Sequence, residues 1–258
     1  MSGGRVRARV GEIGRTLFES AARQGAAHLV LVDPDRVTPE RASELARECA
    51  EASADAILIG SSTPPERDPA LILGAIRRGA HLPIILFPGA ADQLFPGVDA
   101  VLFLSLLSGR DARYLVDEQV RGAPKLLAWG IEAIPTGYLL IGDSEESTVA
   151  RATGTSPLPA EPPAPVVAHA QAAACLGMAM VYLEGGSGAH HPVPAALVRA
   201  VSRAVPTPVA VGGGIRHPAE AAALVAAGAR LIVTGTAHER GLAVRPFTDA
   251  VHGAAVAV

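Results

Sequence analysis

The sequence is poor in lysine, cysteine and aromatic residues. Of its 22 basic residues only Lys125 is a lysine, and aromatic residues make up 3% of the 258-residue chain. An enzyme that forms a Schiff base on a barrel needs a lysine at a strand end, and Lys125 does not end a strand-like run, so this chemistry is disfavoured. The shortage of lysine and the abundance of alanine instead indicate a GC-rich genome.

The sequence also lacks a basic surface and long apolar runs. Its net charge of −3 and its few aromatic side chains give no sign of a nucleic-acid-binding protein. No apolar run approaches the roughly 18 residues of a membrane-spanning helix, and MSGGRVRARV lacks the apolar core of a signal peptide. We therefore expect a cytoplasmic, soluble protein with at most a peripheral membrane contact.

Cysteine and histidine offer no pattern of a metal site. Cys49 and Cys175 are isolated, so we expect two buried free thiols. His190 and His191 are adjacent, whereas a zinc pair on a helix has the spacing i, i+4. No zinc site is predicted.

Short apolar runs alternate with helix-like segments along nearly the whole chain. The strand-like runs are 28–34, 55–60, 83–89, 98–106, 137–142, 179–184, 208–214 and 231–235. The helix-like segments are 39–51, 68–79, 111–121, 168–176, the stretch from 194 onward, and 218–228. Continuous apolar runs are typical of a parallel sheet covered on both faces. The order predicts one α/β domain over 1–258, a (β/α)8 TIM barrel, with an open doubly wound sheet as the alternative.

Three segments depart from this alternation. The run 83–89 is followed by a loop-like segment, so we expect a loop in place of the third helix of the barrel. Residues 1–27 are expected to contain an N-terminal helix that packs on the barrel. Residues 143–166 are rich in Pro, Ser, Thr and Ala, which predicts a mobile loop after the fifth strand, placed to act as a lid.

Two glycine-rich turns follow the last two strands. Gly212-Gly213-Gly214 ends the seventh strand, and Gly235-Thr236 ends the eighth. In barrels the loops after strands seven and eight commonly bind phosphate through backbone amides and a helix N-terminus. Two such turns in succession favour a phosphate site over ordinary tight turns.

Acidic residues stand at the ends of two other strands. In VYLEGGSG, Glu184 ends an apolar run and enters a glycine-rich loop, which suits a carboxylate that acts on a bound ligand. In LVDPD, Asp33 continues the first strand, where it could bind a divalent cation, act as a base or cap a helix. Ser61 or Ser62 after the second strand could offer a hydroxyl to the same ion.

Together, these motifs resemble a known family. LVDPDR, ILIGSS, ILFPG, FLSLLSGR, IPTGYLLI, VYLEGGSG, VGGGI and VTGTAHE occur in the order found in the geranylgeranylglyceryl phosphate synthase family, over roughly residues 28–240. That family includes heptaprenylglyceryl phosphate synthases and the moenomycin-type farnesyl 3-phosphoglycerate synthases. The resemblance implies a TIM-barrel prenyltransferase, and a homodimer or larger oligomer. Such enzymes use Mg²⁺ to join an allylic prenyl diphosphate to a phosphorylated three-carbon acceptor.

The resemblance also assigns roles to residues. It implies that Asp33 and Ser62 hold the metal, that Glu184 takes the proton of the acceptor hydroxyl, and that Tyr138 lies by the reacting allylic carbon. The residues implied to line the acceptor are Tyr182, Leu183, Glu184, Gly185, Gly186, Ser187 and Gly188. Those implied to bind its phosphate are Gly213, Gly214, Gly235 and Thr236.

The sequence leaves the identity of the acceptor open. Ser108 and Thr236 stand where the family often has asparagine, and both changes concern the acceptor side. The GC-rich composition favours a source in which ether lipids are unexpected, so 3-phosphoglycerate with a farnesyl donor is the leading expectation. Arg36, His190 or His191 would then bind its carboxylate. The alternatives are sn-glycerol 1-phosphate as acceptor, a phosphosugar isomerase, and a phosphate-binding barrel without catalysis.

Overall fold

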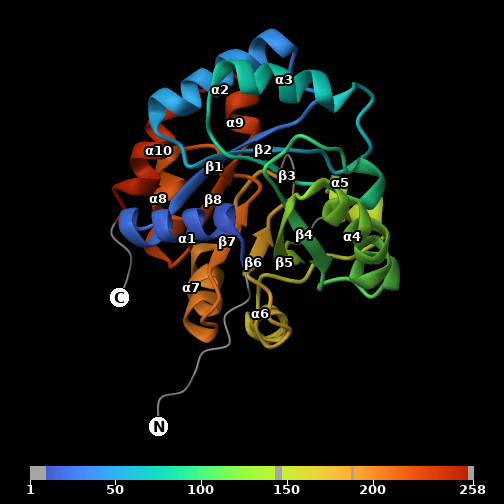
Figure 1. Cartoon of the computed structure of the whole chain (residues 1–258). Coiled ribbons are helices and arrows are strands. Elements are labelled where there is room, and N and C mark those ends of the chain that lie inside the picture. Colours follow the sequence, from blue (N-terminus) through green and yellow to red (C-terminus); the bar gives the residue numbers. More distant parts are fainter. Residues whose placement is uncertain (1–9, 143–146, 187–188, 255–258) are drawn as a thin grey trace.

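A closed barrel of parallel strands forms the centre of the molecule (Figure 1). This computed structural model describes residues 10–142, 147–186 and 189–254. The strands are β1 (Ala27–Val32), β2 (Ala56–Ile59), β3 (Ile84–Leu86), β4 (Ala100–Leu106), β5 (Glu132–Leu140), β6 (Met180–Glu184), β7 (Val209–Gly212) and β8 (Leu231–Thr234). Each strand pairs with the next, and β8 pairs with β1, which confirms the predicted TIM barrel and rejects the open sheet.

Helices surround the barrel on the outside. They are α2 (Pro39–Ala52), α3 (Pro69–Gly79), α4 (Glu118–Trp129), α6 (Ala164–Cys175), α7 (Ala195–Ala204), α8 (Pro218–Ala226) and α10 (Arg245–His252). Local sequence explains where several begin. Thr38 caps α2 by accepting a hydrogen bond from Arg41 N at 3.3 Å, and Asp68 caps α3 through Ala70 N at 2.9 Å. A proline follows each of these caps, where its missing N–H costs nothing.

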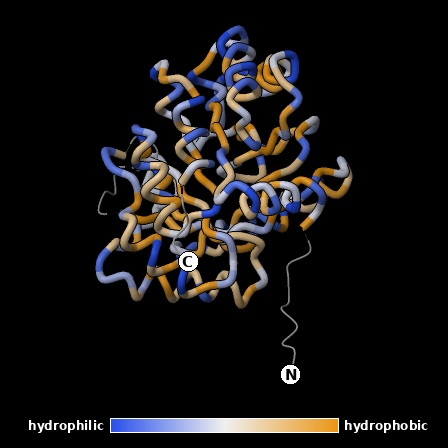
Figure 2. The backbone as a smooth tube through the Cα atoms, turned by 90° about the vertical axis from the view of Figure 1, so that its left-hand side faces the viewer, coloured by the Kyte–Doolittle hydropathy of each residue, from blue (hydrophilic) through white to orange (hydrophobic). Residues whose placement is uncertain are grey.

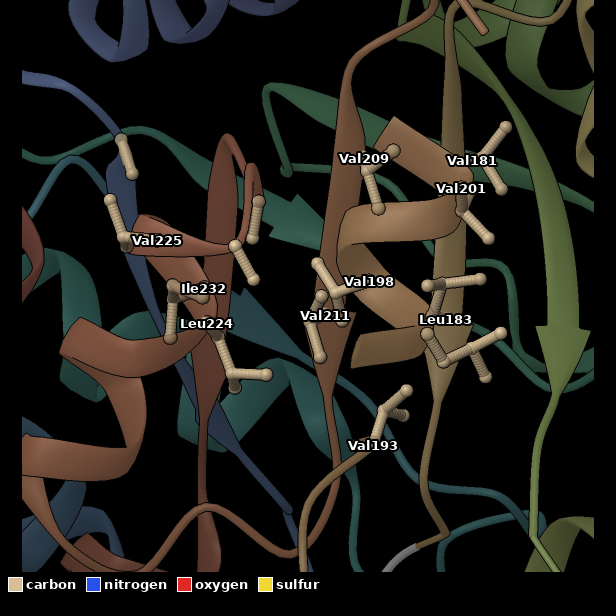
Figure 3. Packing of buried hydrophobic residues seen from close by; sticks show 14 of the residues in the cluster. Val181, Leu183, Val193, Val198, Val201, Val209, Val211, Leu224, Val225 and Ile232 are labelled. Atoms are coloured by element: carbon tan, nitrogen blue, oxygen red, sulfur yellow. The ribbon is translucent and has the colours of Figure 1, made fainter. Parts of the chain in front are cut away.

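Apolar side chains fill both faces of the strands. Residues that point outward pack under the helices, as Val181 and Leu183 of β6 and Val211 of β7 do beneath Val198 of α7 (Figure 3). Residues that point inward, such as Leu29, Leu58 and Leu102, fill the barrel. Burial on both faces explains the continuous apolar runs, and Figure 2 shows such segments alternating with hydrophilic ones along the backbone.

Helix α1 (Glu12–Gln24) closes the barrel at the end where the strands begin. Its Leu17 and Ala21 belong to the same apolar cluster as the barrel interior. Glu132, the first residue of β5, accepts hydrogen bonds from Ile13 N at 2.8 Å and Gly14 N at 2.9 Å. A carboxylate at this helix N-terminus replaces the missing side-chain cap at Gly11.

The connection from β3 to β4 contains only the 3-10 turn η1 (Ala91–Gln93), which confirms the expected loss of the third barrel helix. On the next connection a π-helical turn, η2 (Arg113–Asp117), precedes α4. Single π turns inside helices are frequent at functional sites. Both segments border the cavity described below.

The segment after β5 is more ordered in secondary structure than its composition predicts. It contains the short helix α5 (Thr148–Thr153), a bridge between Ile141 and Leu158, and the start of α6 at Ala164. Residues 143–146 lie outside the described residues. Ser147 caps α5 by accepting a hydrogen bond from Ala150 N at 3.0 Å. A serine that contributes to the loop-like composition thus begins a helix here.

Other details of the sequence prediction need correction. β5 begins at Glu132, five residues before the predicted start. The prediction was too short because Pro135 interrupts the apolar run. Pro135 nevertheless belongs to the sheet, since its carbonyl accepts a hydrogen bond from Ala179 N at 2.8 Å. Cys49 is buried as expected, whereas Cys175 is exposed at the end of α6. In the part of the chain that the structure describes, no helix is long and apolar enough to cross a membrane.

Candidate active site

A cavity of about 310 Å³ lies at the carboxyl ends of the barrel strands. One part of it is polar, and its lining includes Asp33, Ser61, Ser62, Glu184, Gly213, Gly214, Arg216, Gly235, Thr236 and Glu239. The other part is apolar and extends along the β3–β4 side, where its lining includes Phe87, Leu94, Phe103, Leu104, Leu106, Tyr114 and Val149. No full helix follows β3, and the apolar part occupies the side of the barrel that η1 and η2–α4 border.

Glu184 is the buried acid of the cavity, with 6% of its surface exposed. Its Oε1 accepts a hydrogen bond from Gly186 N at 2.7 Å, and the hydroxyls of Tyr138 and Tyr182 also bond to its carboxylate. Burial raises the pKa of Glu184 to about 7, although all three hydrogen bonds oppose the increase. The carboxyl group is therefore neutral below about pH 7 and becomes a base above it.

Two tyrosines stack beside this acid. Tyr138 and Tyr182 are neighbours across β5 and β6, and their ring centroids lie 5.4 Å apart at 29°. Phe87 packs against Tyr182 at 5.2 Å. Burial, followed by the charge of Glu184, raises the pKa of both tyrosines well above the usual value, so both stay protonated as hydrogen-bond donors. Aromatic faces and a carboxylate thus border the same space.

The turn after β7 has its backbone held open. Gly213 and Gly214 have φ of 82° and 71°, the left-handed region that favours glycine. A Cβ at Gly213 would overlap Glu184 Oε1 and would lie 2.7 Å from Gly186 N. No carbonyl of a described residue accepts a hydrogen bond from the amides of Gly213 or Gly214. These amides can therefore donate to an anion beside Glu184.

The turn after β8 also has backbone amides that can donate to an anion, whereas the amides that precede the helix after β7 are occupied. Gly235 and Thr236 line the cavity, and within the described ranges their amides donate to no backbone carbonyl outside the sheet ladders. The amides before α8 are occupied, since the Glu220 carboxylate accepts from Arg216 N at 2.7 Å and His217 N at 2.9 Å. The helix N-terminus expected at these two loops is therefore that of α9 (Thr236–Glu239), which begins at Thr236 in the cavity lining.

The glycine-rich loop after β6 contributes less than expected. Tyr182 and Glu184 line the cavity, but Leu183 points outward beneath α7 (Figure 3) and does not face the site. After Glu184, the amide of Gly185 donates to Gly212 O at 2.9 Å, and the amide of Gly186 donates to Glu184 Oε1. Ser187 and Gly188 lie outside the described residues.

Asp33 lies across the cavity at the end of β1. Its Oδ1 accepts from Asp35 N at 3.0 Å, its Oδ2 lies 3.4 Å from Arg36 Nε, and the Ser61 hydroxyl also bonds to it. Burial raises the pKa of Asp33. Ser61 and Ser62 both line the cavity next to it, so the two candidate hydroxyls remain beside the carboxylate.

Five charged residues of the cavity lining were not predicted from the sequence: Asp92, Arg113, Glu118, Arg216 and Glu239. Glu239 belongs to the short helix α9 (Thr236–Glu239) and pairs with Arg36 at 3.1 Å, while burial raises its pKa. Arg216 lines the cavity and donates to Ala189 O at 2.9 Å. The sequence feature that could have indicated Arg216 as a cavity residue is its position directly after GGGI. His190 and His191 are exposed and do not line the cavity, so the proposed role for them in carboxylate binding is wrong.

Helix α5 covers the apolar part of the cavity. Val149, Ala152 and Thr153 line it, and Ala152 O accepts a hydrogen bond from the Tyr114 hydroxyl at 3.0 Å. The segment after β5 therefore lies over the site, as a lid would, and connects to η2 on the other side.

Fold and cavity together define a TIM-barrel protein whose strand-end site combines an anion pocket, a buried carboxylate and an apolar groove. Comparison with known proteins narrows this class. A model described as the PcrB family matches residues 20–250, and the chain belongs to that family.

Named relatives agree with this assignment. Geranylgeranylglyceryl phosphate synthase of Methanopyrus kandleri is 46% identical over 213 residues, which cover 83% of this chain and 88% of that protein. The protein of the same name from Spirosoma linguale is 39% identical and covers 83% of this chain, matched over 86% of its own length. A crystal structure of (S)-3-O-geranylgeranylglyceryl phosphate synthase from Thermoplasma acidophilum with sn-glycerol-1-phosphate has a TM-score of 0.85 and 35% identity, and the match covers 92% of this chain and 99% of that one.

Proposed function

We propose that the protein is a prenyltransferase that forms an ether bond between an allylic prenyl diphosphate and the hydroxyl of sn-glycerol 1-phosphate. The observation that carries this proposal is the placement of Glu184 between an apolar groove and backbone amides that donate to no carbonyl of the described residues. A phosphorylated alcohol suits the polar part, and a prenyl chain suits the apolar part. Relatives that carry the name geranylgeranylglyceryl phosphate synthase support the same reaction.

In this reaction Glu184 removes the proton of the acceptor hydroxyl. The alcohol becomes acidic only as its oxygen bonds to the allylic carbon, so a carboxylate within hydrogen-bond reach suffices as the base. The amides of Gly213, Gly214, Gly235 and Thr236 would hold the phosphate and so aim the hydroxyl at Glu184. The phosphate thus serves to orient the acceptor as well as to bind it.

On the donor side, positive charge grows on the allylic carbon while the bond to diphosphate breaks. The stacked rings of Tyr138 and Tyr182 present aromatic faces that stabilise a cation in a dry site. Their hydroxyls donate to Glu184 and also keep its carboxylate oriented. The tail of the donor would lie along Phe87, Leu104 and Leu106, with α5 excluding water.

The diphosphate requires a counter-charge, and Asp33 and Ser62 fit Mg²⁺. Mg²⁺ takes one or two protein oxygens and keeps water and substrate phosphate as its other ligands. Among the described residues no group of three His, Cys, Asp or Glu side chains could hold a metal alone, so we expect the ion to bind together with the diphosphate. When bound, it would neutralise charge on the leaving diphosphate.

Removing the metal should stop the reaction. We expect EDTA to abolish product formation and added Mg²⁺ to restore it, because the diphosphate would otherwise leave without a counter-charge. D33N should raise the Mg²⁺ concentration for half-maximal activity by at least about tenfold, the factor that corresponds to ~1.4 kcal/mol. The matched control is D35N, since Asp35 binds Glu66 N and Arg67 N at 3.0 Å outside the cavity lining. Full activity in EDTA would reject the metal.

The acceptor proposed here replaces the earlier leading expectation of 3-phosphoglycerate. The named relatives favour glycerol phosphate, and the two histidines expected to bind a carboxylate are exposed outside the cavity lining. The homodimer and the peripheral membrane contact remain predictions.

Product analysis tests the function directly. The protein is incubated with farnesyl or geranylgeranyl diphosphate and with sn-glycerol 1-phosphate or 3-phosphoglycerate, and the products are identified by mass spectrometry. We expect a prenyl ether with glycerol 1-phosphate as the preferred acceptor. An ether formed only with 3-phosphoglycerate would reject the acceptor, and absence of any ether would reject prenyl transfer.

A further inference from the structure

Below the β8 turn, a chain of four buried side chains connects four elements of the fold. Thr248 Oγ1 of α10 lies 2.8 Å from His28 Nδ1 of β1, and His28 Nε2 lies 2.7 Å from Thr234 Oγ1 of β8. Thr234 Oγ1 also lies 2.8 Å from His238 Nε2 of α9. All four side chains are at most 2% exposed, so water does not compete for these hydrogen bonds.

When both imidazoles are neutral, the end of the chain determines the direction of every hydrogen bond in it. His238 Nδ1 lies 2.9 Å from Leu242 O, a carbonyl that can only accept, so this nitrogen carries the hydrogen. In a neutral ring His238 Nε2 then accepts from the Thr234 hydroxyl. Thr234 has only one hydrogen, so its oxygen accepts from His28 Nε2–H. In a neutral His28 ring Nδ1 then accepts from the Thr248 hydroxyl at 2.8 Å, in preference to the longer contact of 3.4 Å between Thr248 Oγ1 and Val244 O.

In this arrangement two neutral imidazoles are opposite tautomers. His28 carries its hydrogen on Nε2, and His238 carries it on Nδ1. Burial, followed by the neighbouring His238, lowers the pKa of His28 to about 3, while Asp55 opposes the decrease. Burial likewise lowers the pKa of His238. The neutral forms are thus the stable ones near pH 7.

The chain ends at the turn that faces the cavity. Thr234 is the last residue of β8 and lines the cavity, and Gly235 and Thr236 follow it directly. His238 belongs to the four-residue helix α9 and packs edge-on against Phe247 at 5.2 Å. A helix of one turn has little stability of its own. The residues on either side of the turn, 234 and 238, are therefore held by the same hydroxyl.

We propose that Thr234, oriented by His28 and His238, is a positioning residue that fixes the Gly235–Thr236 amides for the acceptor phosphate. Thr234 does not itself bind the reacting atoms. The proposal rests on the proposed function for the identity of the phosphorylated ligand, but the hydrogen-bond chain can be tested without it.

The first test measures the imidazole tautomers in the wild-type protein. Nitrogen-15 NMR at pH 7 should show His28 protonated at Nε2 only and His238 protonated at Nδ1 only. A charged ring, or the same tautomer at both positions, would overturn the directional chain whatever the protein catalyses.

The second test uses T234V, which keeps the shape and removes the hydroxyl. We expect KM for glycerol 1-phosphate to rise roughly 10- to 100-fold, because a displaced turn loses amide contacts to the phosphate and a buried donor and acceptor lose their partner. KM for the prenyl diphosphate should change less than about threefold, an effect below 1 kcal/mol. T234S keeps the hydroxyl and should restore the wild-type KM.

The matched control is T136V. Thr136 is also fully buried, its hydroxyl donates to Ile134 O at 2.9 Å, and it does not line the cavity. Equal KM values for T234V and T136V would overturn the positioning role. Should T234V not fold, the imidazole tautomers of the wild type and the KM of T234S for glycerol 1-phosphate still test the hydrogen-bond chain. A wild-type protein that makes no ether would reject the proposed function instead, and calorimetric titration with glycerol 1-phosphate then compares the same variants.

Discussion

Replacing Glu184 by glutamine is expected to lower kcat for ether formation by roughly 10²- to 10⁴-fold, the range typical of a lost general base. Glutamine keeps the size of the side chain and an oxygen that can accept from Gly186 N, Tyr138 and Tyr182, as Glu184 does. Binding of both substrates should therefore change little. Steady-state kinetics together with calorimetric titration of glycerol 1-phosphate measures the two effects separately.

The pH profile of the wild-type protein is the companion measurement. Because burial raises the pKa of Glu184 to about 7, kcat/KM should rise about tenfold per pH unit below pH 7 and level off above it. The residual activity of E184Q should lack this rise. Wild-type activity that is constant from pH 5 to 8, or an E184Q variant that retains most of its kcat, would show that Glu184 is not the base.

The melting temperature of E184Q tests whether its loss of activity is caused by unfolding. The carboxyl pKa rises from 4.5 to about 7 on folding, so the folded state binds the proton more tightly and becomes less stable as the pH increases through this range. The cost above pH 7 is on the order of 3 kcal/mol. E184Q avoids it, and its melting temperature at pH 8 should equal or exceed that of the wild type.

Substituting Gly213 with alanine is the second change with a large expected effect. The new Cβ would overlap Glu184 Oε1 and crowd Gly186 N, and alanine does not tolerate a φ of 82°. Either the carboxylate or the amides of the β7 turn must then move. We expect kcat/KM to fall by about 10²-fold or more, the scale associated with a displacement near 1 Å in an active site.

G177A is the control that separates steric effects from backbone strain. Gly177 has a φ of 77°, close to that of Gly213, but a Cβ there meets nothing within 4 Å. Both variants should lose similar stability from the left-handed backbone. Equal activity losses in G213A and G177A would mean that strain, and not contact with Glu184, explains the effect.

The barrel was predictable because its strands are buried on both faces. Runs such as 55–60 and 231–235 are apolar apart from Asp55 and Thr234, and the structure places β2 and β8 within them. β5 was predicted only in part because Glu132 and Pro135 stand in its first half. Helix α5 was missed because the composition of its segment is typical of a loop. A contact distant in sequence holds the helix in place, the hydrogen bond from the Tyr114 hydroxyl of η2 to Ala152 O.

The site shows the same division. Glu184, Gly213 and Gly235 stand at strand ends, where barrel geometry alone brings residues together, and all three line one cavity. Glu239 was not predictable, because its place depends on α9, a helix of one turn that tertiary contacts support. Leu183 was assigned to the acceptor although alternation along β6 turns it outward, away from its neighbours Tyr182 and Glu184.

The most direct test is a crystal structure of E184Q with sn-glycerol 1-phosphate and an unreactive thio-analogue of the prenyl diphosphate. The account predicts that the acceptor phosphate accepts hydrogen bonds from the amides of Gly213, Gly214, Gly235 and Thr236, with the hydroxyl in contact with residue 184 and facing the allylic carbon. A phosphate bound away from these two turns, or a hydroxyl that points away from residue 184, would contradict it.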